Sequence, residues 1–153
     1  MDEPGYQPAI GWHRANTRRA FSFSDKGEKV APAPVILVVE DDWLLRQALE
    51  QELAAAGWAV REAESGETAL EILKSGAVVD LLVTDIRLGG AADGWDVAEA
   101  FRAADARLPV IYVSGNPQRE ARRVAGSVFM PKPCDPARLV ETCRTLLQSR
   151  SGH

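Results

Sequence analysis

From residue 35 onwards the sequence alternates between two hydrophobic periods, and this alternation restricts the folds that the chain can adopt. Short apolar runs with no sustained alternation are typical of strands covered on both faces. Between these runs, apolar residues recur three or four positions apart, as they do on one face of a helix. Five strand and helix units in succession predict an α/β protein, in which a doubly wound, five-stranded parallel sheet has helices on both faces.

The predicted elements follow directly from these periods. The predicted strands are residues 35–40, 58–62, 80–85, 109–114 and 128–131. The predicted helices are residues 45–56, 67–74, 95–104, 117–125 and 136–147. Gly57 stands where the first helix should end, while Asp42 and Asp135 stand at the N-cap positions of the first and last helices. We therefore expect one domain over residues 35–150.

The first 34 residues differ in composition from the rest of the chain. Proline, glycine, serine and charged residues are interleaved without a sustained period, and residues 31–34 read Ala-Pro-Ala-Pro. Such composition is typical of an extended spacer. We predict that residues 1–34 form a flexible extension, with a short docking segment at WHRANTRRAF as the alternative.

Composition and charge argue against several classes of function. The chain of 153 residues has a net charge of −4, and residues 35–153 show no basic face of the kind that nucleic-acid-binding proteins present. No apolar run approaches the roughly 20 residues that a membrane span needs, and the N-terminus lacks a signal-peptide layout. The two cysteines form no C-x-x-C pair. We expect a cytoplasmic protein that binds neither nucleic acid nor membrane.

Charged and hydroxyl side chains follow four of the predicted strands. Glu40 ends the first and Asp41 follows it, Asp85 ends the third, Ser114 ends the fourth and Lys132 follows the fifth. Because the carboxyl ends of parallel strands share one edge of the sheet, these side chains are expected to lie together. Carboxylates crowded there repel one another unless a cation is present, and Mg²⁺ prefers oxygen ligands. The sequence therefore predicts a magnesium site at this edge.

These residues, in this order and at these strand ends, resemble the response-regulator receiver domains of two-component signalling. The resemblance covers about residues 35–150 and includes the acidic pair Glu40-Asp41, Asp85 as phosphoacceptor, Ser114, Phe129 as switch aromatic, and Lys132-Pro133. It implies the flavodoxin-like receiver fold. It also implies a phosphoacceptor in a phosphorelay, phosphorylated by a histidine kinase or a histidine phosphotransferase.

The resemblance assigns the metal site and the nucleophile. Asp85 would form an acyl phosphate through its carboxylate. Asp41, Asp85 and the backbone carbonyl of Arg87 would be direct Mg²⁺ ligands, and Glu40 would act through water. The chain would have at most slow self-catalysed phosphorylation and dephosphorylation, so we do not expect an enzyme.

The resemblance also assigns the residues that respond to phosphorylation. Lys132 and the Ser114 hydroxyl would each contact a phosphoryl oxygen. Ser114 and an inward turn of Phe129 would form the switch, although core packing explains Phe129 equally well and Ser114 could be a turn residue. The signal would reach a protein partner or a second copy through the surface of the fourth helix, the fifth strand and the fifth helix.

Two departures from the family pattern bear on this interpretation. The stretch between Ser114 and Lys132 is short for the family, so the fourth helix is predicted to be truncated or irregular. Gly89-Gly90 stand where a proline is common.

Three functional classes also bear on this interpretation. A stand-alone phosphoacceptor is the favoured class, with a receiver fragment of a hybrid histidine kinase or a phosphate sink as alternatives. An aspartyl phosphatase of the haloacid dehalogenase class would carry Asp-x-Asp, whereas this chain has Asp85-Ile86-Arg87. A degenerate receiver that only binds partners is the third class.

Overall fold

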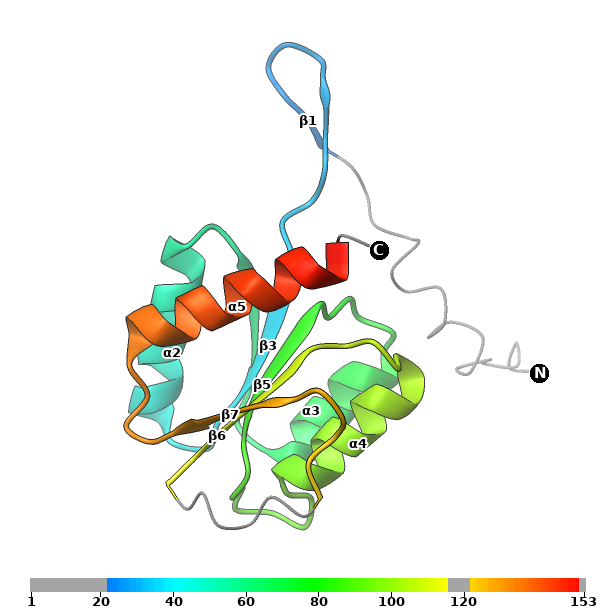
Figure 1. The fold of residues 1–153 in the computed structure, drawn as a ribbon. Coiled ribbons are helices and arrows are strands. Elements are labelled where there is room, and N and C mark those ends of the chain that lie inside the picture. Colours follow the sequence, from blue (N-terminus) through cyan, green and yellow to red (C-terminus); the bar gives the residue numbers. More distant parts are fainter. Residues whose placement is uncertain (1–21, 116–121, 152–153) are drawn as a thin grey trace, which may run out of the picture.

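The computed structural model describes residues 22–115 and 122–151, and its centre is a five-stranded parallel sheet (Figure 1). The strands are β3 (Val35–Val39), β4 (Ala59–Ala63), β5 (Leu81–Asp85), β6 (Val110–Ser114) and β7 (Val128–Pro131). Their order across the sheet is β4-β3-β5-β6-β7, which is the flavodoxin-like order. The predicted fold class is confirmed, and each strand boundary lies within one residue of the predicted one.

Four helices are present in the described part of the chain. They are α2 (Trp43–Ala55), α3 (Gly66–Lys74), α4 (Gly94–Ala104) and α5 (Pro136–Ser151). The Asp42 carboxylate accepts a hydrogen bond from the Leu45 N–H, and the Asp135 carboxylate accepts one from the Ala137 N–H. Both predicted N-caps are therefore confirmed. Gly57 follows α2 with a φ of 99°, a left-handed conformation that favours glycine.

The helices cover both faces of the sheet, and the alternation of side chains along each strand supplies two cores. Figure 1 shows α2 and α5 on one face and α3 and α4 on the other. Along β3, Ile36 and Val38 belong to the core beneath α2 and α5, and Leu37 and Val39 belong to the core beneath α3 and α4. Burying one such aliphatic side chain contributes about 1.5 to 3 kcal/mol. Both faces are covered, which explains why the strands read as continuous apolar runs.

The connection between β6 and β7 lacks a helix in its described part. The predicted fourth helix spans residues 117–125, of which 117–121 lie outside the described residues. Residues 122–125 form turns and irregular backbone rather than helix, so the helix prediction is wrong for these positions. This outcome agrees with the predicted truncation. The segment is instead held by side chains, because Arg122 pairs with Asp96 and Glu99 of α4.

A short hairpin precedes the domain. Strands β1 (Ser22–Phe23) and β2 (Lys29–Val30) pair in antiparallel fashion within the predicted extension. No period in the sequence predicts this hairpin, and Gly27 at a φ of 76° turns the chain between its strands. The predicted docking segment WHRANTRRAF lies outside the described residues.

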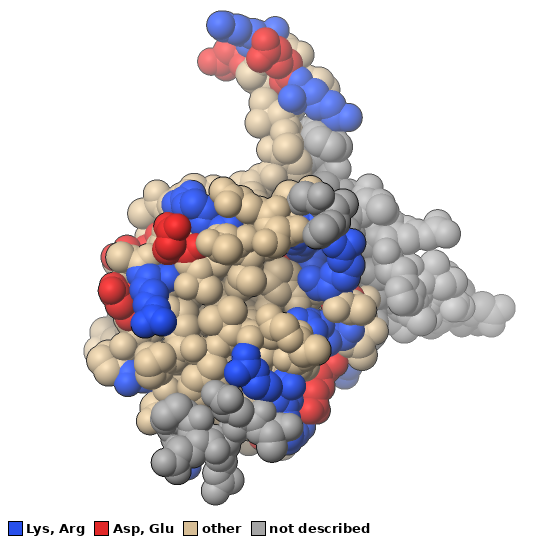
Figure 2. Space-filling model, in the orientation of Figure 1, with Lys and Arg blue, Asp and Glu red and all other residues tan. Residues whose placement is uncertain are grey.

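The surface and the helices bear on the predicted absence of nucleic acid and membrane as partners. Figure 2 shows lysine and arginine on this face in separate groups, with broad uncharged surface between them. No helix in the described ranges is both long and apolar enough to cross a bilayer.

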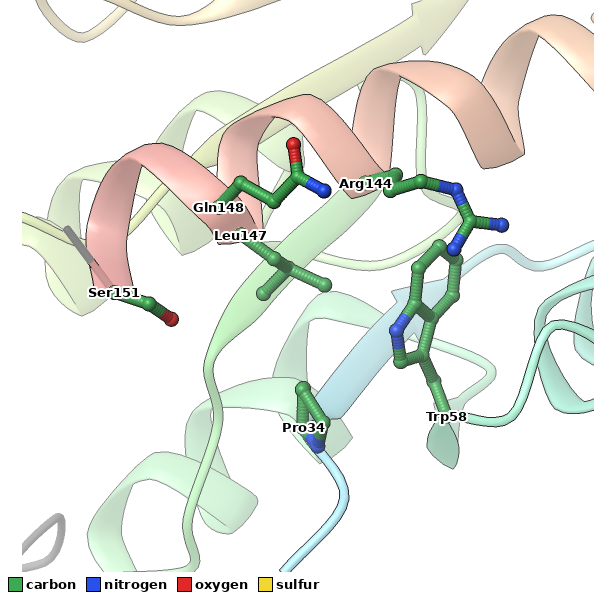
Figure 3. Close-up of a pocket in the computed structure, with 6 residues that line it drawn as sticks. All are labelled: Pro34, Trp58, Arg144, Leu147, Gln148 and Ser151. Carbon is green, nitrogen blue, oxygen red and sulfur yellow. The ribbon is translucent and has the colours of Figure 1, made fainter. Parts of the chain in front are cut away.

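A hollow of about 480 Å³ lies at the amino ends of β3 and β4, away from the carboxyl edge of the sheet (Figure 3). It is lined by Pro34, Trp58, Arg144, Leu147, Gln148 and Ser151.

Candidate functional site

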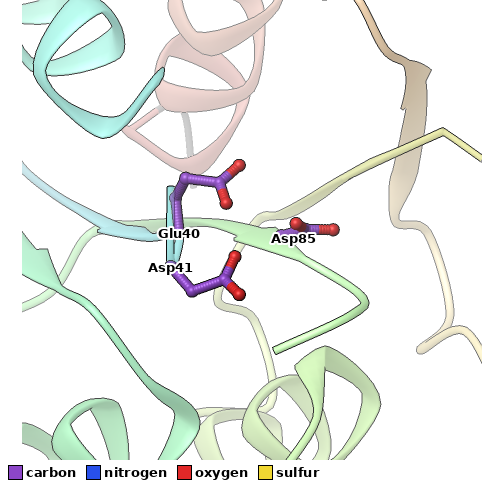
Figure 4. A group of neighbouring side chains, drawn as sticks. All are labelled: Glu40, Asp41 and Asp85. Atoms are coloured by element: carbon purple, nitrogen blue, oxygen red, sulfur yellow. The ribbon is translucent and has the colours of Figure 1, made fainter. Parts of the chain in front are cut away.

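Three carboxylates meet at the carboxyl edge of the sheet. Glu40 and Asp41 directly follow β3, and Asp85 ends the neighbouring strand β5. One carboxylate oxygen from each lies within 4.8 Å of one from each of the others. Figure 4 shows Glu40 and Asp41 reaching from the end of β3 toward the side on which Asp85 lies. The structure brings these three predicted site residues together, because the parallel ladder aligns the ends of β3 and β5.

Lys132 bridges the two buried carboxylates of this cluster. Its Nζ lies 2.8 Å from Glu40 Oε1 and 2.8 Å from Asp85 Oδ2. Its backbone N–H donates a hydrogen bond of 2.9 Å to the Ser114 carbonyl, and the Lys132–Pro133 peptide bond is cis. Burial by itself lowers the pKa of the Lys132 ammonium, but the hydrogen bonds to Asp85 and Glu40 outweigh it, and the pKa is raised. Lys132 therefore stays charged at neutral pH.

Glu40 is the most deeply buried member of the cluster, with 2% of its surface exposed. Burial raises the pKa of its carboxyl from 4.5 to about 7, against the opposing hydrogen bonds from Lys132 and the Asp42 N–H. A carboxylate in this position is favoured by additional positive charge nearby. The electrostatics of Glu40 therefore favour cation binding at this edge.

Asp85 is held by the backbone that follows it. It is 7% exposed, and its Oδ1 accepts a hydrogen bond of 3.2 Å from the Arg87 N–H. The Thr84 hydroxyl donates to the Asp85 carbonyl at 2.8 Å. A Cβ at Gly94 would overlap that carbonyl oxygen, so α4 can begin this close to β5 only with glycine there. Thr84 and Gly94 were not predicted from the sequence, although the Asp93-Gly94 pair at a helix start is a detectable signal.

Arg46 holds the end of β3 in place and was also not identified from the sequence. Its guanidinium donates to the Glu40 carbonyl at 2.8 Å and pairs with the Glu62 carboxylate at 3.2 Å. Arg46 lies in the first turns of α2 and Glu62 lies on β4. The contact joins three elements at the edge that carries the acids. Its position four residues after the N-cap Asp42 was the available signal.

The donor set fits a hard divalent cation. Glu40, Asp41 and Asp85 offer carboxylate oxygens, which Mg²⁺ prefers over nitrogen or sulfur ligands. Asp41 is exposed, so the cluster is open to solvent on one side. The Arg87 backbone lies beside Asp85 through its N–H, and the role of its carbonyl as a ligand stays a prediction.

Ser114 and Phe129 lie on the two strands beyond Asp85. Ser114 is buried at the end of β6, beside Pro131 in the ladder. Phe129 on β7 is partly buried and packs against the core beneath α3 and α4. The structure therefore places Ser114 at the carboxyl edge and Phe129 two positions before the end of β7. Their roles in switching stay predictions.

Two large apolar side chains stand exposed next to the acids. Trp43 is 60% exposed and Leu44 is 70% exposed, and both lie in the first turn of α2. Large apolar side chains that are mostly exposed and adjacent are characteristic of interaction surfaces. This apolar pair is two residues from Asp41, so a protein bound here would lie next to the acidic cluster.

The family model described as response regulator receiver domain matches residues 36–144 of this chain. Among curated proteins, the alkaline phosphatase synthesis transcriptional regulatory protein SphR of Synechococcus elongatus is 33% identical over 131 residues. That match covers 77% of this chain and 50% of SphR. The sensor kinase CckA of Brucella abortus is 29% identical over 131 residues, a match that covers 82% of this chain and 14% of the kinase. The chain therefore spans half or less of the length of these relatives.

Two solved receiver structures are matched over almost their whole length. A response regulator receiver protein from Sinorhizobium medicae WSM419 is 38% identical with a TM-score of 0.74, and the match covers 77% of this chain and 97% of that one. The receiver domain from the hybrid histidine kinase CckA is 34% identical with a TM-score of 0.65, covering 74% and 98% respectively.

Proposed function

Because this chain belongs to the family of response regulator receiver domains, we propose that Asp85 accepts a phosphoryl group from a phosphohistidine of a histidine kinase or a histidine phosphotransferase. One observation carries the proposal above the others. The Lys132 ammonium lies 2.8 Å from Asp85 Oδ2, while the Arg87 N–H orients Oδ1. A nucleophilic carboxylate is thus held beside the cation that would meet the incoming phosphoryl oxygens.

The transfer requires little covalent chemistry from the protein beyond the nucleophile itself. An Asp85 oxygen forms a bond to phosphorus while the bond between phosphorus and the histidine nitrogen breaks, and the electron pair of that bond stays on the leaving imidazole. Lys132 stabilises negative charge on the transferred group, and Ser114 donates a hydrogen bond to it. Mg²⁺ held by Glu40, Asp41, Asp85 and the Arg87 carbonyl would supply further charge neutralisation when bound.

The same site argues for a phosphoacceptor rather than an enzyme with its own substrate. An aspartyl phosphatase of the haloacid dehalogenase class needs a second carboxylate at the position of Arg87. We propose at most slow self-catalysed phosphorylation and dephosphorylation, in the cytoplasm and without nucleic acid or membrane as a partner.

The phosphodonor would dock on the first turn of α2. Trp43 and Leu44 offer exposed apolar surface two residues from Asp41. A helical phosphodonor seated on this pair would carry its histidine to the carboxyl edge of the sheet. The output would pass through the segment after β6, through β7 and through α5, to a protein partner or a second copy.

A receiver segment of a hybrid histidine kinase is the second candidate. The specific observation is the similarity to CckA, both to the sensor kinase of Brucella abortus and to the solved receiver domain. In that role Asp85 would pass its phosphoryl group onward instead of driving an output surface. The chemistry at Asp85 is the same in both cases.

The decisive experiment measures phosphorylation of the purified chain. We expect incubation with a small-molecule phosphodonor and Mg²⁺ to add one phosphoryl mass to the intact protein. An acyl phosphate is labile, so hydroxylamine should remove the added mass. Asp85→Ala should abolish labelling, because the nucleophile is gone. Asp105→Asn is the matched control, since Asp105 follows α4 at the other edge of the sheet and should label as the wild type does.

Two results would contradict the proposal. One is an added mass that survives in Asp85→Ala at the wild-type level, which would place the acceptor elsewhere. The other is a wild type that takes up no phosphoryl group from any small phosphodonor at saturating Mg²⁺. The second result would favour the degenerate receiver.

A further inference from the structure

Tyr112 is a fully buried tyrosine on β6, two residues before Ser114. Residues two apart in a strand project to the same face of the sheet, so both side chains lie on the face covered by α3 and α4. The Tyr112 ring packs against Trp95 of α4, with 4.7 Å between the ring centroids. Its hydroxyl oxygen accepts a hydrogen bond of 3.1 Å from the Val124 N–H. One side chain therefore joins the strand that carries Ser114 to α4 and to residues 122–127.

Phe129 lies directly beside Tyr112 in the sheet. The two residues are Cα partners between β6 and β7, and both side chains pack in the same core. Tyr112 is fully buried, whereas Phe129 is partly exposed, so the Tyr112 ring holds the inner position. Protein interiors are close-packed and leave few voids. An inward turn of Phe129 therefore needs space that the Tyr112 ring now fills.

Residues 122–127 are anchored by contacts of different stiffness, besides the packing of the Val124 side chain against the core beneath α3 and α4. The Arg122 guanidinium lies 3.0 Å from an Asp96 oxygen and 2.7 Å from a Glu99 oxygen, and all three side chains are about half exposed. Long exposed side chains can follow a backbone movement without losing their ion pairs. The Tyr112 hydroxyl, in contrast, sits on a buried ring that Trp95 holds in place. A shift of the segment would therefore break the hydrogen bond from Val124 and keep the ion pairs.

We propose that Tyr112 couples the phosphoacceptor site to residues 122–127: Val124 donates its hydrogen bond to Tyr112 in the unmodified protein and loses it when Asp85 is phosphorylated. The inference rests on the proposed function. A phosphoryl group on Asp85 adds charge and acceptor oxygens beside the Ser114 hydroxyl, so we expect phosphorylation to draw the end of β6 toward Asp85. Tyr112 lies two residues before Ser114 on the same strand, so this movement changes the distance between the Tyr112 hydroxyl and the Val124 N–H. With this hydrogen bond lost, the Tyr112 ring keeps its packing against Trp95 but is no longer held at its hydroxyl end, so it can tilt to make room for Phe129.

The test follows the amide hydrogen exchange of Val124 by NMR in the full chain, with Mg²⁺ and with or without beryllofluoride. Beryllofluoride takes the place of the phosphoryl group on Asp85. In the wild type we expect it to speed exchange at Val124 about tenfold, as for the loss of one hydrogen bond. In Tyr112→Phe, exchange at Val124 should be fast in both states, and the response of Phe129 to beryllofluoride should shrink. Arg122→Gln is the matched control and should keep the wild-type response.

The signal of the Arg87 amide separates failure of the inference from failure of the proposed function. Arg87 donates to Asp85 Oδ1, so its amide shift reports whether beryllofluoride has bound. A shifted Arg87 signal with unchanged exchange at Val124 would overturn the coupling and leave the phosphoacceptor function standing. A Tyr112→Phe variant in which Phe129 responds as in the wild type would also overturn it, because Tyr112 would then have only a structural role. An Arg87 signal that never shifts would overturn both.

Discussion

Replacing Lys132 by methionine should show how strongly the acidic cluster depends on one ammonium group. Lys132 Nζ lies 2.8 Å from both Glu40 Oε1 and Asp85 Oδ2. At an effective dielectric constant of about 20, each contact corresponds to about 6 kcal/mol of attraction before desolvation is subtracted. The carboxylate oxygens of Glu40 and Asp85 lie within 4.8 Å of one another, so their repulsion under the same assumption is at least about 3.5 kcal/mol. The methionine variant would keep the repulsion and lose the attraction.

We therefore expect Lys132→Met to lower the free energy of unfolding by about 3 kcal/mol in chelator, at the lower end for a broken buried ion pair because Lys132 is partly exposed. Urea unfolding at about pH 9 is the assay, because the carboxylate of Glu40 must be ionised in both proteins. Burial raises the pKa of Glu40 to about 7, and loss of the hydrogen bond from Lys132 raises it further in the variant. Saturating Mg²⁺ should reduce the difference in the free energy of unfolding between the variant and the wild type by about 1 kcal/mol or more, because a bound cation replaces the missing charge.

Lys74→Met is the control, because Lys74 is exposed in the last turn of α3. This substitution should lower the free energy of unfolding by less than about 1 kcal/mol. The stability of the variant should respond to Mg²⁺ as that of the wild type does. Equal stability of Lys132→Met and the wild type in chelator would refute the electrostatic reasoning. A destabilised Lys132→Met whose free energy of unfolding, like that of the wild type, does not change with Mg²⁺ would refute the metal site instead.

Two further predictions concern the surroundings of the site. Gly94→Ala should lower the free energy of unfolding by about 1 to 3 kcal/mol in urea titrations, since its Cβ would overlap the Asp85 carbonyl oxygen. Gly115→Ala is the control, because a Cβ there would meet no atom of the described residues within 4 Å, and it should lower the free energy of unfolding by less. Equal losses in the two variants would contradict the steric argument. A hydrogen bond from the Asp93 N–H lowers the pKa of the Asp96 carboxyl below its usual 3.8. The ionised Asp96 carboxylate therefore stabilises the folded protein above pH 3.8, and this stabilisation is lost as the pH falls through the lowered pKa. Asp96→Asn should therefore be less stable than the wild type at about pH 6, and the difference in stability should shrink as the pH falls below 3.8. Parallel pH profiles of the two proteins in thermal melts would argue against this.

The fold could be predicted from the sequence because its determinants are local. Strands buried on both faces need continuous apolar runs, and helices that cover a sheet need an apolar stripe. Side-chain chemistry at the helix ends is equally local, as Asp42 and Asp135 show. Chain direction then places the ends of all parallel strands at one edge. The proximity of Glu40, Asp41 and Asp85 followed from that rule and from nothing else.

The segments that the sequence did not predict have weaker local signals. The hairpin at residues 22–30 lies in a stretch without a clear period, and two strands of two residues are too short to produce one. Residues 122–125 contain no glycine or proline that would exclude a helix, yet they form turns and irregular backbone. Their conformation depends on Arg122 meeting α4 and on Val124 meeting Tyr112. Both contacts join residues that are distant in the sequence.

The sequence by itself determined the parallel sheet, the helix caps and the edge at which the acids gather, because period, capping chemistry and chain direction are properties of neighbouring residues. Only the tertiary structure decided which side chains touch. It showed that Lys132 lies between Glu40 and Asp85, that Gly94 is required by close approach, and that Tyr112 and Phe129 are neighbours in one core. These contacts depend on distances between separate elements, and those distances are set when the two cores pack.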